Sequence, residues 1–172
     1  MRSDVRQDWD WSDGYLGEIA KILRRNAHRI LSIKVAGCNK DLKHATDMVI
    51  AVEGGDVAVR VRRAEYRKKW RDLTIRSWRA GGIKTELHKI KEGAGDWYLY
   101  AWSDGDKRLS DWMLVDLNKV RESGLLNRPE RANKDGRTRF IAISDKELRR
   151  CGCMVSEATD ETPVLDYTEW EQ

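Results

Sequence analysis

Bases are concentrated in one segment of the chain, Arg60–Arg79, which also contains Trp70 and Trp78. This segment holds nine bases against two acids, Glu65 and Asp72. Lys and Arg bind polyanions because the displaced counterions supply binding free energy, and aromatic rings stack on nucleic-acid bases. The pattern predicts a nucleic-acid-binding surface formed by Arg60, Arg62, Arg63, Arg67, Lys68, Lys69, Arg71, Arg76, Arg79, Trp70 and Trp78. The alternative is a solvated, ion-paired surface, which is what most charge runs form.

Charge is distributed unevenly along the chain. The 172 residues include 33 bases and 29 acids, for a net charge of +4. Residues 156–172 hold six of those acids and no base, which leaves a net charge of +10 on residues 1–155. A basic body of this kind favours polyanionic partners. We therefore expect one domain over residues 1–155, followed by an acidic and loosely packed tail over residues 156–172.

Composition and motifs argue against several classes of protein. No run approaches the roughly 18 apolar residues of a membrane span, and the first residues lack the apolar run of a signal peptide. The three cysteines, Cys38, Cys151 and Cys153, are too few for a disulfide scaffold. The sequence contains no phosphate-binding glycine loop, no zinc-ligand spacing and no nucleophile motif near its three histidines. We expect a cytoplasmic protein with no membrane contact.

The apolar pattern predicts a mixed α/β fold. Apolar residues recur at helical spacing from Asp13 to Ser32, with Asp13 as the N-cap. β-rich runs and capping motifs, including the Ser144–Glu147 capping box, predict the remaining elements. Strands are expected at 46–52, 57–62, 73–76, 97–102, 111–115 and 138–143, and helices at 86–91, at 118–123 and after Ser144. This order favours one mixed central β-sheet flanked by helices. Because Phe occurs once, Trp and Tyr of strands 97–102 and 111–115 are expected to pack the core.

The glycines at 54 and 55 predict a hairpin between strands 46–52 and 57–62. If Glu53 lies opposite Asp56, then Val49 lies opposite Arg60 and Asp47 lies opposite Arg62. One face of the hairpin then carries Asp47, Val49, Ala51, Ala58, Arg60 and Arg62. The other face is apolar throughout and is expected to pack against the core.

A helix with Glu18, a strand that begins near Asp47, and a hairpin into a strand with Arg60 and Arg62 follow one another in the chain. This order resembles the PD-(D/E)XK nuclease superfamily over roughly residues 14–115. In that family a helix acid, a strand Asp and an acid-x-Lys motif gather at one sheet face, where the acids hold Mg²⁺ and the Lys orients the attacking water. The chemistry is reasonable, since Mg²⁺ prefers carboxylate oxygens and phosphodiester cleavage needs neutralised charge.

The chain departs from the family pattern at the acid-x-Lys position, where it reads Arg60-Val61-Arg62. Arginine does not ligate a metal and makes a poor general base, although Arg62 can clamp a phosphate. Two alternatives remain open: Glu86 and Lys89, one helical turn apart, supply the missing groups, or the site is inactive. A further alternative makes Asp47 and Arg62 an ordinary cross-strand ion pair.

The resemblance implies a PD-(D/E)XK-like α/β fold and a Mg²⁺-dependent DNA endonuclease. It makes Asp47, Glu18 and Glu86 the metal ligands, with Lys89 and Arg62 completing the catalytic set. The second hypothesis is a non-catalytic module that binds nucleic acid through Arg60–Arg79. A third is a protein-interaction module, whose basic face meets an acidic protein partner, the acidic tail or a second copy of the chain.

Overall fold

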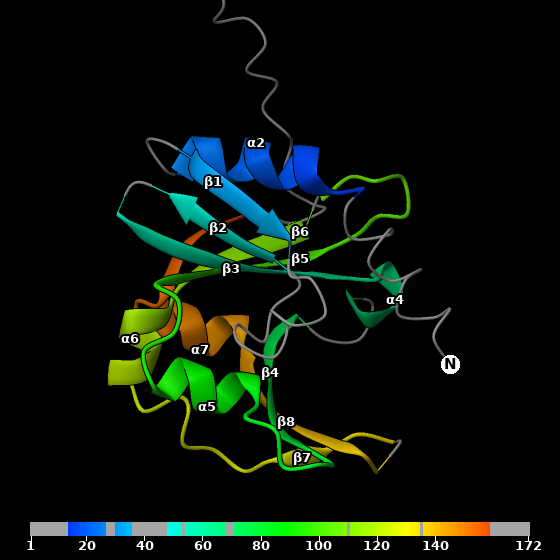
Figure 1. Cartoon of the computed structure of the whole chain (residues 1–172), viewed down its shortest axis with the longest axis vertical. Coiled ribbons are helices and arrows are strands. Elements are labelled where there is room, and N and C mark those ends of the chain that lie inside the picture. Colours follow the sequence, from blue (N-terminus) through cyan, green and yellow to red (C-terminus); the bar gives the residue numbers. More distant parts are fainter. Residues whose placement is uncertain are drawn as a thin grey trace, which may run out of the picture.

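The computed structural model describes residues 14–26, 30–35, 48–52, 54–67, 71–109, 111–134 and 136–158, with only the backbone described for 30–35 and 48–49. These residues form an α/β structure with helices on both sides of a central sheet (Figure 1). The strands of the central sheet are β1 (Ile30–Val35), β2 (Met48–Val52), β3 (Gly55–Arg62), β5 (Trp97–Trp102), β6 (Asp111–Asp116) and β9 (Met154–Ala158). The helices are α2 (Leu16–Asn26), α4 (Ala64–Arg67), α5 (Glu86–Lys91), α6 (Leu117–Glu122) and α7 (Asp145–Arg150).

The central sheet is mixed, as predicted. Its six described strands lie in the order β1-β2-β3-β5-β6-β9. Strand β5 runs parallel to β3, whereas the other neighbours are antiparallel. The parallel pair requires a crossover connection, and α5 lies within it.

The prediction of a single sheet was wrong. Strand β4 (Asp72–Arg79), which contains the predicted strand 73–76, pairs with β8 (Thr138–Ser144), and β8 pairs with β7 (Arg131–Ala132). These three form a separate antiparallel sheet in the order β4-β8-β7. Residues 80–137 lie between β4 and β8, so the pairing depends on tertiary packing and not on a local turn.

The β2–β3 hairpin exists, but its predicted register was wrong by two residues. Val52 lies opposite Gly55, and Val49 lies opposite Ala58. Gly55 belongs to the strand, and this position requires glycine because Asp96 lies against it: a Cβ at Gly55 would come 2.5 Å from Asp96 Oδ2. The same carboxylate accepts a hydrogen bond from the Asp56 amide at 2.9 Å. A shift of two residues preserves the side-chain alternation, so the predicted faces are correct for the described side chains.

The first helix is shorter than predicted. Helix α2 ends at Asn26, and the chain is already a strand at Ile30, within the range expected to be helical. Ile30 and Leu31 therefore do not continue the helix; as β-branched and apolar residues they also suit a strand. The predicted cap, Asp13, lies outside the described residues.

Local signals located the later elements well. Helix α5 covers the predicted residues 86–91 and is preceded by Thr85 as N-cap. Ser144 and Glu147 form the predicted capping box at the start of α7. Strand β9 was not predicted, and it continues to Ala158, three residues into the segment that the charge pattern assigns to the acidic tail. Among the described residues, no helix is long and apolar enough to cross a membrane.

Two apolar cores lie on opposite faces of the central sheet. Helix α2 covers one face and packs Ile19 and Leu23 against the valines of β3. The other face is covered by α5, α6, α7 and the three-stranded sheet (Figure 1). Trp102 and Trp112 are buried, which confirms their predicted core role, whereas Trp97 is partly buried. The polar face of β3 thus looks toward the second sheet rather than toward α2.

Candidate functional site

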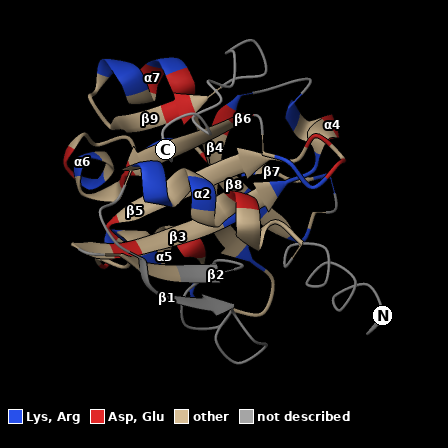
Figure 2. Ribbon diagram, turned by 90° about the horizontal axis from the view of Figure 1, so that it is seen from above, with Lys and Arg blue, Asp and Glu red and all other residues tan. Residues whose placement is uncertain are grey.

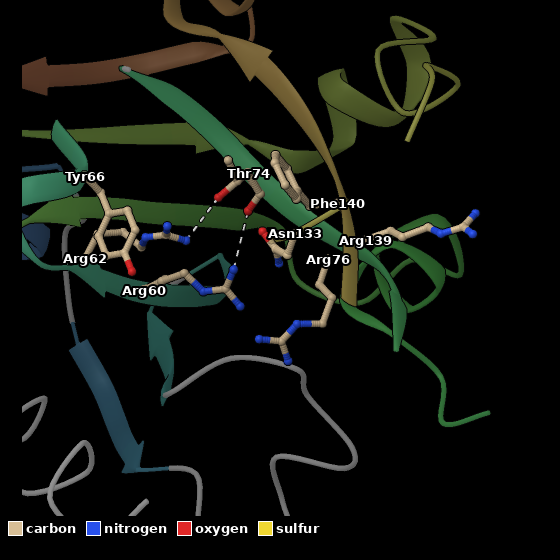
Figure 3. A pocket seen from close by; sticks show the side chains of 8 residues that line it. All are labelled: Arg60, Arg62, Tyr66, Thr74, Arg76, Asn133, Arg139 and Phe140. Atoms are coloured by element: carbon tan, nitrogen blue, oxygen red, sulfur yellow. Dashed lines mark hydrogen bonds between the residues drawn. The ribbon is translucent and has the colours of Figure 1, made fainter. Parts of the chain in front are cut away.

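A cleft lies between the polar face of β3 and the second sheet (Figure 3). We call it the arginine cleft, and its volume is about 330 Å³. Strand β3, helix α4, strand β4 and the β7–β8 hairpin supply its walls. The lining residues are Arg60, Arg62, Tyr66, Thr74, Arg76, Asn133, Arg139 and Phe140.

The alternation of β3 directs its arginines into this cleft. Val57, Val59 and Val61 are buried against α2, so Arg60 and Arg62 point to the opposite face of the sheet. Neighbouring β5 fills the rest of that face with aromatic rings: the Tyr98 and Tyr100 rings meet edge to face at 5.8 Å, as do those of Tyr100 and Trp102 at 5.1 Å. These buried rings pack beside the two arginines on that face of the central sheet.

Glu86 holds Arg60 in place. The Glu86 carboxylate is 2% exposed and lies 3.1 Å from Arg60 Nη1. It also accepts hydrogen bonds from the Arg76 amide, at 3.0 Å, and from the Tyr98 hydroxyl. Burial raises the pKa of the Tyr98 hydroxyl well above its usual value, and Arg60 opposes this rise whereas Glu86 adds to it. The hydroxyl therefore stays a proton donor. With three donors on it, the Glu86 carboxylate acts as a positioning group for Arg60.

Thr74 joins the two β3 arginines to strand β4. Arg62 Nη1 donates to Thr74 Oγ1 at 3.2 Å, and Arg60 Nη1 lies 3.4 Å from the Thr74 carbonyl oxygen (Figure 3). The Thr74 hydroxyl also bonds the Tyr100 hydroxyl at 2.6 Å. These bonds link the two sheets at the back of the cleft and restrict the rotamers of both arginines.

Two exposed aromatic rings accompany arginines of the cleft. The Arg62 guanidinium lies 4.5 Å from the centre of the Tyr66 ring, and that of Arg139 lies 5.5 Å from the centre of the Trp78 ring. Tyr66 is 53% exposed and Trp78 is 42% exposed. Figure 3 shows Tyr66 in front of Arg62 at one end of the cleft, with Arg139 extending away at the other end. In Figure 2, Lys and Arg colour parts of β7 and β8, on the same side of the molecule as α4.

The cleft is strongly cationic. Among the residues that the structure describes, its lining contains four arginines and no carboxylate. The charge of Arg60 is paired with the buried Glu86. Glu130 lies 3.6 Å from Arg139 at the surface, and Asp72 interacts with Arg62 at longer range. Arg76 is exposed, and its side chain forms no ion pair with any residue that the structure describes. Arg62 and Arg76 therefore keep donors available to an incoming anion.

The described residues do not bring the predicted metal ligands together. Glu18 lies on α2, across the central sheet from Glu86, and pairs with Lys21 at 2.9 Å. Lys89 is buried one turn along α5 from Glu86. Asp47 lies outside the described residues. Within the part of the chain that is described, no three His, Cys, Asp or Glu residues are grouped closely enough to hold a metal ion.

The predicted basic segment divides into two sets of arginines. Arg60, Arg62 and Arg76 line the cleft. Arg67 and Arg71 instead pair with the buried carboxylate of Asp111, and the Arg71 side chain is only 7% exposed. Both side chains thus form structural ion pairs, and their predicted contact with nucleic acid stays a prediction. Arg63, Arg79 and Trp78 are exposed outside the cleft lining, whereas Lys68, Lys69 and Trp70 lie outside the described residues.

The sequence interpretation missed five of the eight lining residues of the cleft. Tyr66 lies within the basic segment, and its aromatic ring among bases was an available signal. Thr74 lies on a predicted strand, but nothing local marks it as a lining residue. Asn133, Arg139 and Phe140 come from the β7–β8 hairpin, and no local pattern indicates that this hairpin lines the same cleft as β3.

No protein-family model and no curated protein matches this sequence. The geometry and charge of the arginine cleft therefore carry the functional interpretation.

Proposed function

We propose that this protein binds nucleic acid, with phosphate groups of the backbone held by the arginine cleft. The observation that carries the proposal is the lining itself, in which four arginines from three strands line one cavity and no carboxylate is found among the described lining residues. Guanidinium groups present planar pairs of donors that match phosphate oxygens. Glu86 and Thr74 hold Arg60 and Arg62 in advance, which lowers the entropy lost on binding.

The wider charge distribution favours a polyanion over a single small anion. Residues 1–155 carry a net charge of +10, and such a field attracts a polymer of phosphates over many contacts. An acidic protein partner would meet the same field. Guanidinium donors beside exposed aromatic rings, as at Arg62 and Tyr66, favour nucleic acid because bases stack on such rings.

We also propose that the fold is of the PD-(D/E)XK type. In support, α2, β2 and β3 follow one another in the order that the family resemblance requires, with β1 added before β2. The polar face of β3 borders the cleft, where the family places its site. Glu86 is engaged by Arg60 and Glu18 lies on a helix across the sheet, so we restrict the proposed function to binding. Mg²⁺-dependent cleavage remains a prediction that depends on Asp47.

Arg76→Ala tests the proposed function. Because Arg76 is exposed and forms no ion pair among the described residues, its removal should leave the fold intact. The affinity for nucleic acid should fall about 5-fold or more, for loss of one charged hydrogen bond. The slope of log affinity against log salt should decrease by about 1. Fluorescence anisotropy with labelled oligonucleotides at several salt concentrations measures both quantities.

Arg24→Ala is the matched control. Arg24 is exposed on α2, on the other face of the central sheet, and its substitution removes the same charge. It should change the affinity much less than Arg76→Ala does. Equal effects of the two variants would show that binding follows net charge and not the cleft. Absence of any binding by the wild-type protein at low salt would refute the proposed function altogether.

A further inference from the structure

We propose that the arginine cleft takes a single strand of nucleic acid, with one base stacked on the exposed ring of Tyr66. This inference rests on the proposed function and adds the class of nucleic acid to it. A volume of about 330 Å³ is at the lower end for ligand pockets. It accommodates one nucleotide, whereas a duplex would reach the cleft only with its outer phosphates.

Tyr66 has the geometry of a stacking platform. Its ring is 53% exposed, and the Arg62 guanidinium lies 4.5 Å from the ring centre. Arg62 in turn is held by the Thr74 hydroxyl at 3.2 Å. A base on the open side of the ring would complete a stack of guanidinium, phenol and base, with the charge of Arg62 close to the adjacent phosphate.

Strand β4 adds further contacts beyond this platform. Thr74 and Arg76 alternate with the buried residues Leu73 and Ile75, so both lie on one face of β4 and line the cleft. The register of β4 against β8 shifts between Arg76 and Trp78, and Trp78 lies outside the cleft lining. Trp78 is 42% exposed beside Arg139.

An exposed aromatic ring thus lies beside a cleft arginine at two places, Tyr66 beside Arg62 and Trp78 beside Arg139. Bases in a duplex are stacked on each other and cannot reach such rings. The bases of a single strand can turn onto them, and stacking accepts any base because every base has a π-face. The arrangement thus favours a single strand without strong sequence preference.

Tyr66→Ala, with Tyr66→Phe as its conservative partner, tests the inference in the full-length chain. The probes are a labelled oligothymidylate of about 12 nucleotides, a duplex of equal length and inorganic polyphosphate. We expect the wild-type protein to prefer the single strand. Tyr66→Ala should lower single-strand affinity at least about 5-fold, the loss of one base stack. Affinities for duplex and polyphosphate should stay unchanged, and Tyr66→Phe should retain single-strand binding because it keeps the ring.

The outcomes separate this inference from the proposed function. If Tyr66→Ala weakens all three probes equally or none of them, or if the wild-type protein prefers duplex, the single-strand inference is overturned. The proposed function then still stands provided that Arg76→Ala weakens binding and Arg24→Ala does not. If Arg76→Ala has no effect either, the cleft is not the binding site. Circular dichroism and thermal midpoints of each variant verify that the chain remains folded.

Discussion

The cleft arginines differ in how each charge is held. Arg60 is 12% exposed and has the buried counterion Glu86, whereas Arg76 is exposed. A buried ion pair gains little net stability over an apolar pair, but removal of one partner leaves a costly unpaired charge. Glu86 therefore matters for the fold as well as for the position of Arg60.

Glu86→Ala should destabilise the protein by about 3 kcal/mol or more, because Arg60, the Tyr98 hydroxyl and the Arg76 amide all lose their acceptor. Urea unfolding at neutral pH measures the change. Glu92→Ala is the control, since Glu92 pairs with Lys84 at the surface and both side chains are more than half exposed. Its cost should not exceed about 1 kcal/mol. Equal losses in the free energy of unfolding for the two variants would contradict the prediction that the buried contacts of Glu86 contribute strongly to stability.

Asp47→Ala decides between the catalytic and structural interpretations of that carboxylate. If Asp47 is a metal ligand, the wild-type protein cleaves DNA with Mg²⁺, and the variant loses cleavage while its DNA binding is unchanged or stronger. If Asp47 is only a cross-strand partner of an arginine, the substitution costs about 0.2–1 kcal/mol and alters no activity. A gel assay of DNA and RNA with Mg²⁺ or Mn²⁺ separates the two. A wild-type protein without cleavage in that assay leaves the binding function alone.

At the scale of elements, helix α7 is joined to the second sheet by a charged capping motif. Glu147 bonds the Ser144 amide and hydroxyl at 3.0 and 2.7 Å, and its other oxygen lies 2.6 Å from Arg128 Nη2. Arg128 also donates to the Ala142 carbonyl at 2.7 Å. Arg128 and then Ser144 lower the pKa of Glu147 from 4.5 to about 2. The helix start therefore depends on the ionised carboxylate.

This pKa makes stability depend on acid pH. Because the pKa of Glu147 is lower in the folded chain, unfolding takes up a proton between about pH 4.5 and pH 2. Its contribution to the free energy of unfolding is complete above pH 4.5 and is lost as the pH falls toward 2. Urea unfolding at several pH values should show a weaker pH dependence for Glu147→Gln. Part of the pH dependence should remain in this variant, because the pKa of Glu157 is also lowered, chiefly by Arg149 and in addition by Arg71. Identical pH profiles for variant and wild type would contradict the prediction.

Strand β9 is held to the rest of the fold by Arg71. The Arg71 side chain bonds Asp111 and the Trp112 carbonyl of β6, Asp145 of α7, and Glu157 of β9. It also donates to the Ala158 carbonyl oxygen at 3.1 Å. Glu157 is paired with Arg149 as well, so the first acid after residue 155 is part of the folded structure. The remaining acids, residues 160–171, follow the last described strand.

At the scale of the whole molecule, this boundary refines the prediction for the acidic segment. Truncation after Ala158 removes five acids and no base. It should strengthen binding to polyanions, because less negative charge opposes them. Truncation after Val155 also deletes the last three residues of β9, with the contacts of Glu157 and Ala158 to Arg71, and should lower the thermal midpoint.

Anisotropy titrations and thermal unfolding of the two truncated chains measure these effects. The chain that ends at Ala158 should keep the thermal midpoint of the wild type. An unchanged or weaker affinity in this chain would contradict the charge argument. An unchanged thermal midpoint in the shorter chain would show that the Arg71 contacts to β9 contribute little to stability.

Much of the fold was predictable because its signals are local. The run Trp97–Trp102 was predicted with the observed bounds, since aromatic residues favour strands. The capping box at Ser144 marked the start of α7 for the same reason, because its partners are three residues apart. The apolar faces of β2 and β3 also followed from alternation alone, even though their register did not.

Contacts between residues far apart in the chain were decided only by the tertiary structure. The sequence by itself determined the number of bases, their concentration in Arg60–Arg79 and the alternation that puts Arg60 and Arg62 on one face of β3. Tertiary packing decided that β4 pairs with β8 instead of joining the central sheet. It also decided that Arg71 pairs with three carboxylates and that Arg60 pairs with Glu86. These contacts depend on which apolar surfaces can be buried, and which polar and charged groups can be paired, at the same time in the compact chain. A local sequence pattern carries no information about such long-range contacts. The cleft could therefore be identified only from the tertiary structure.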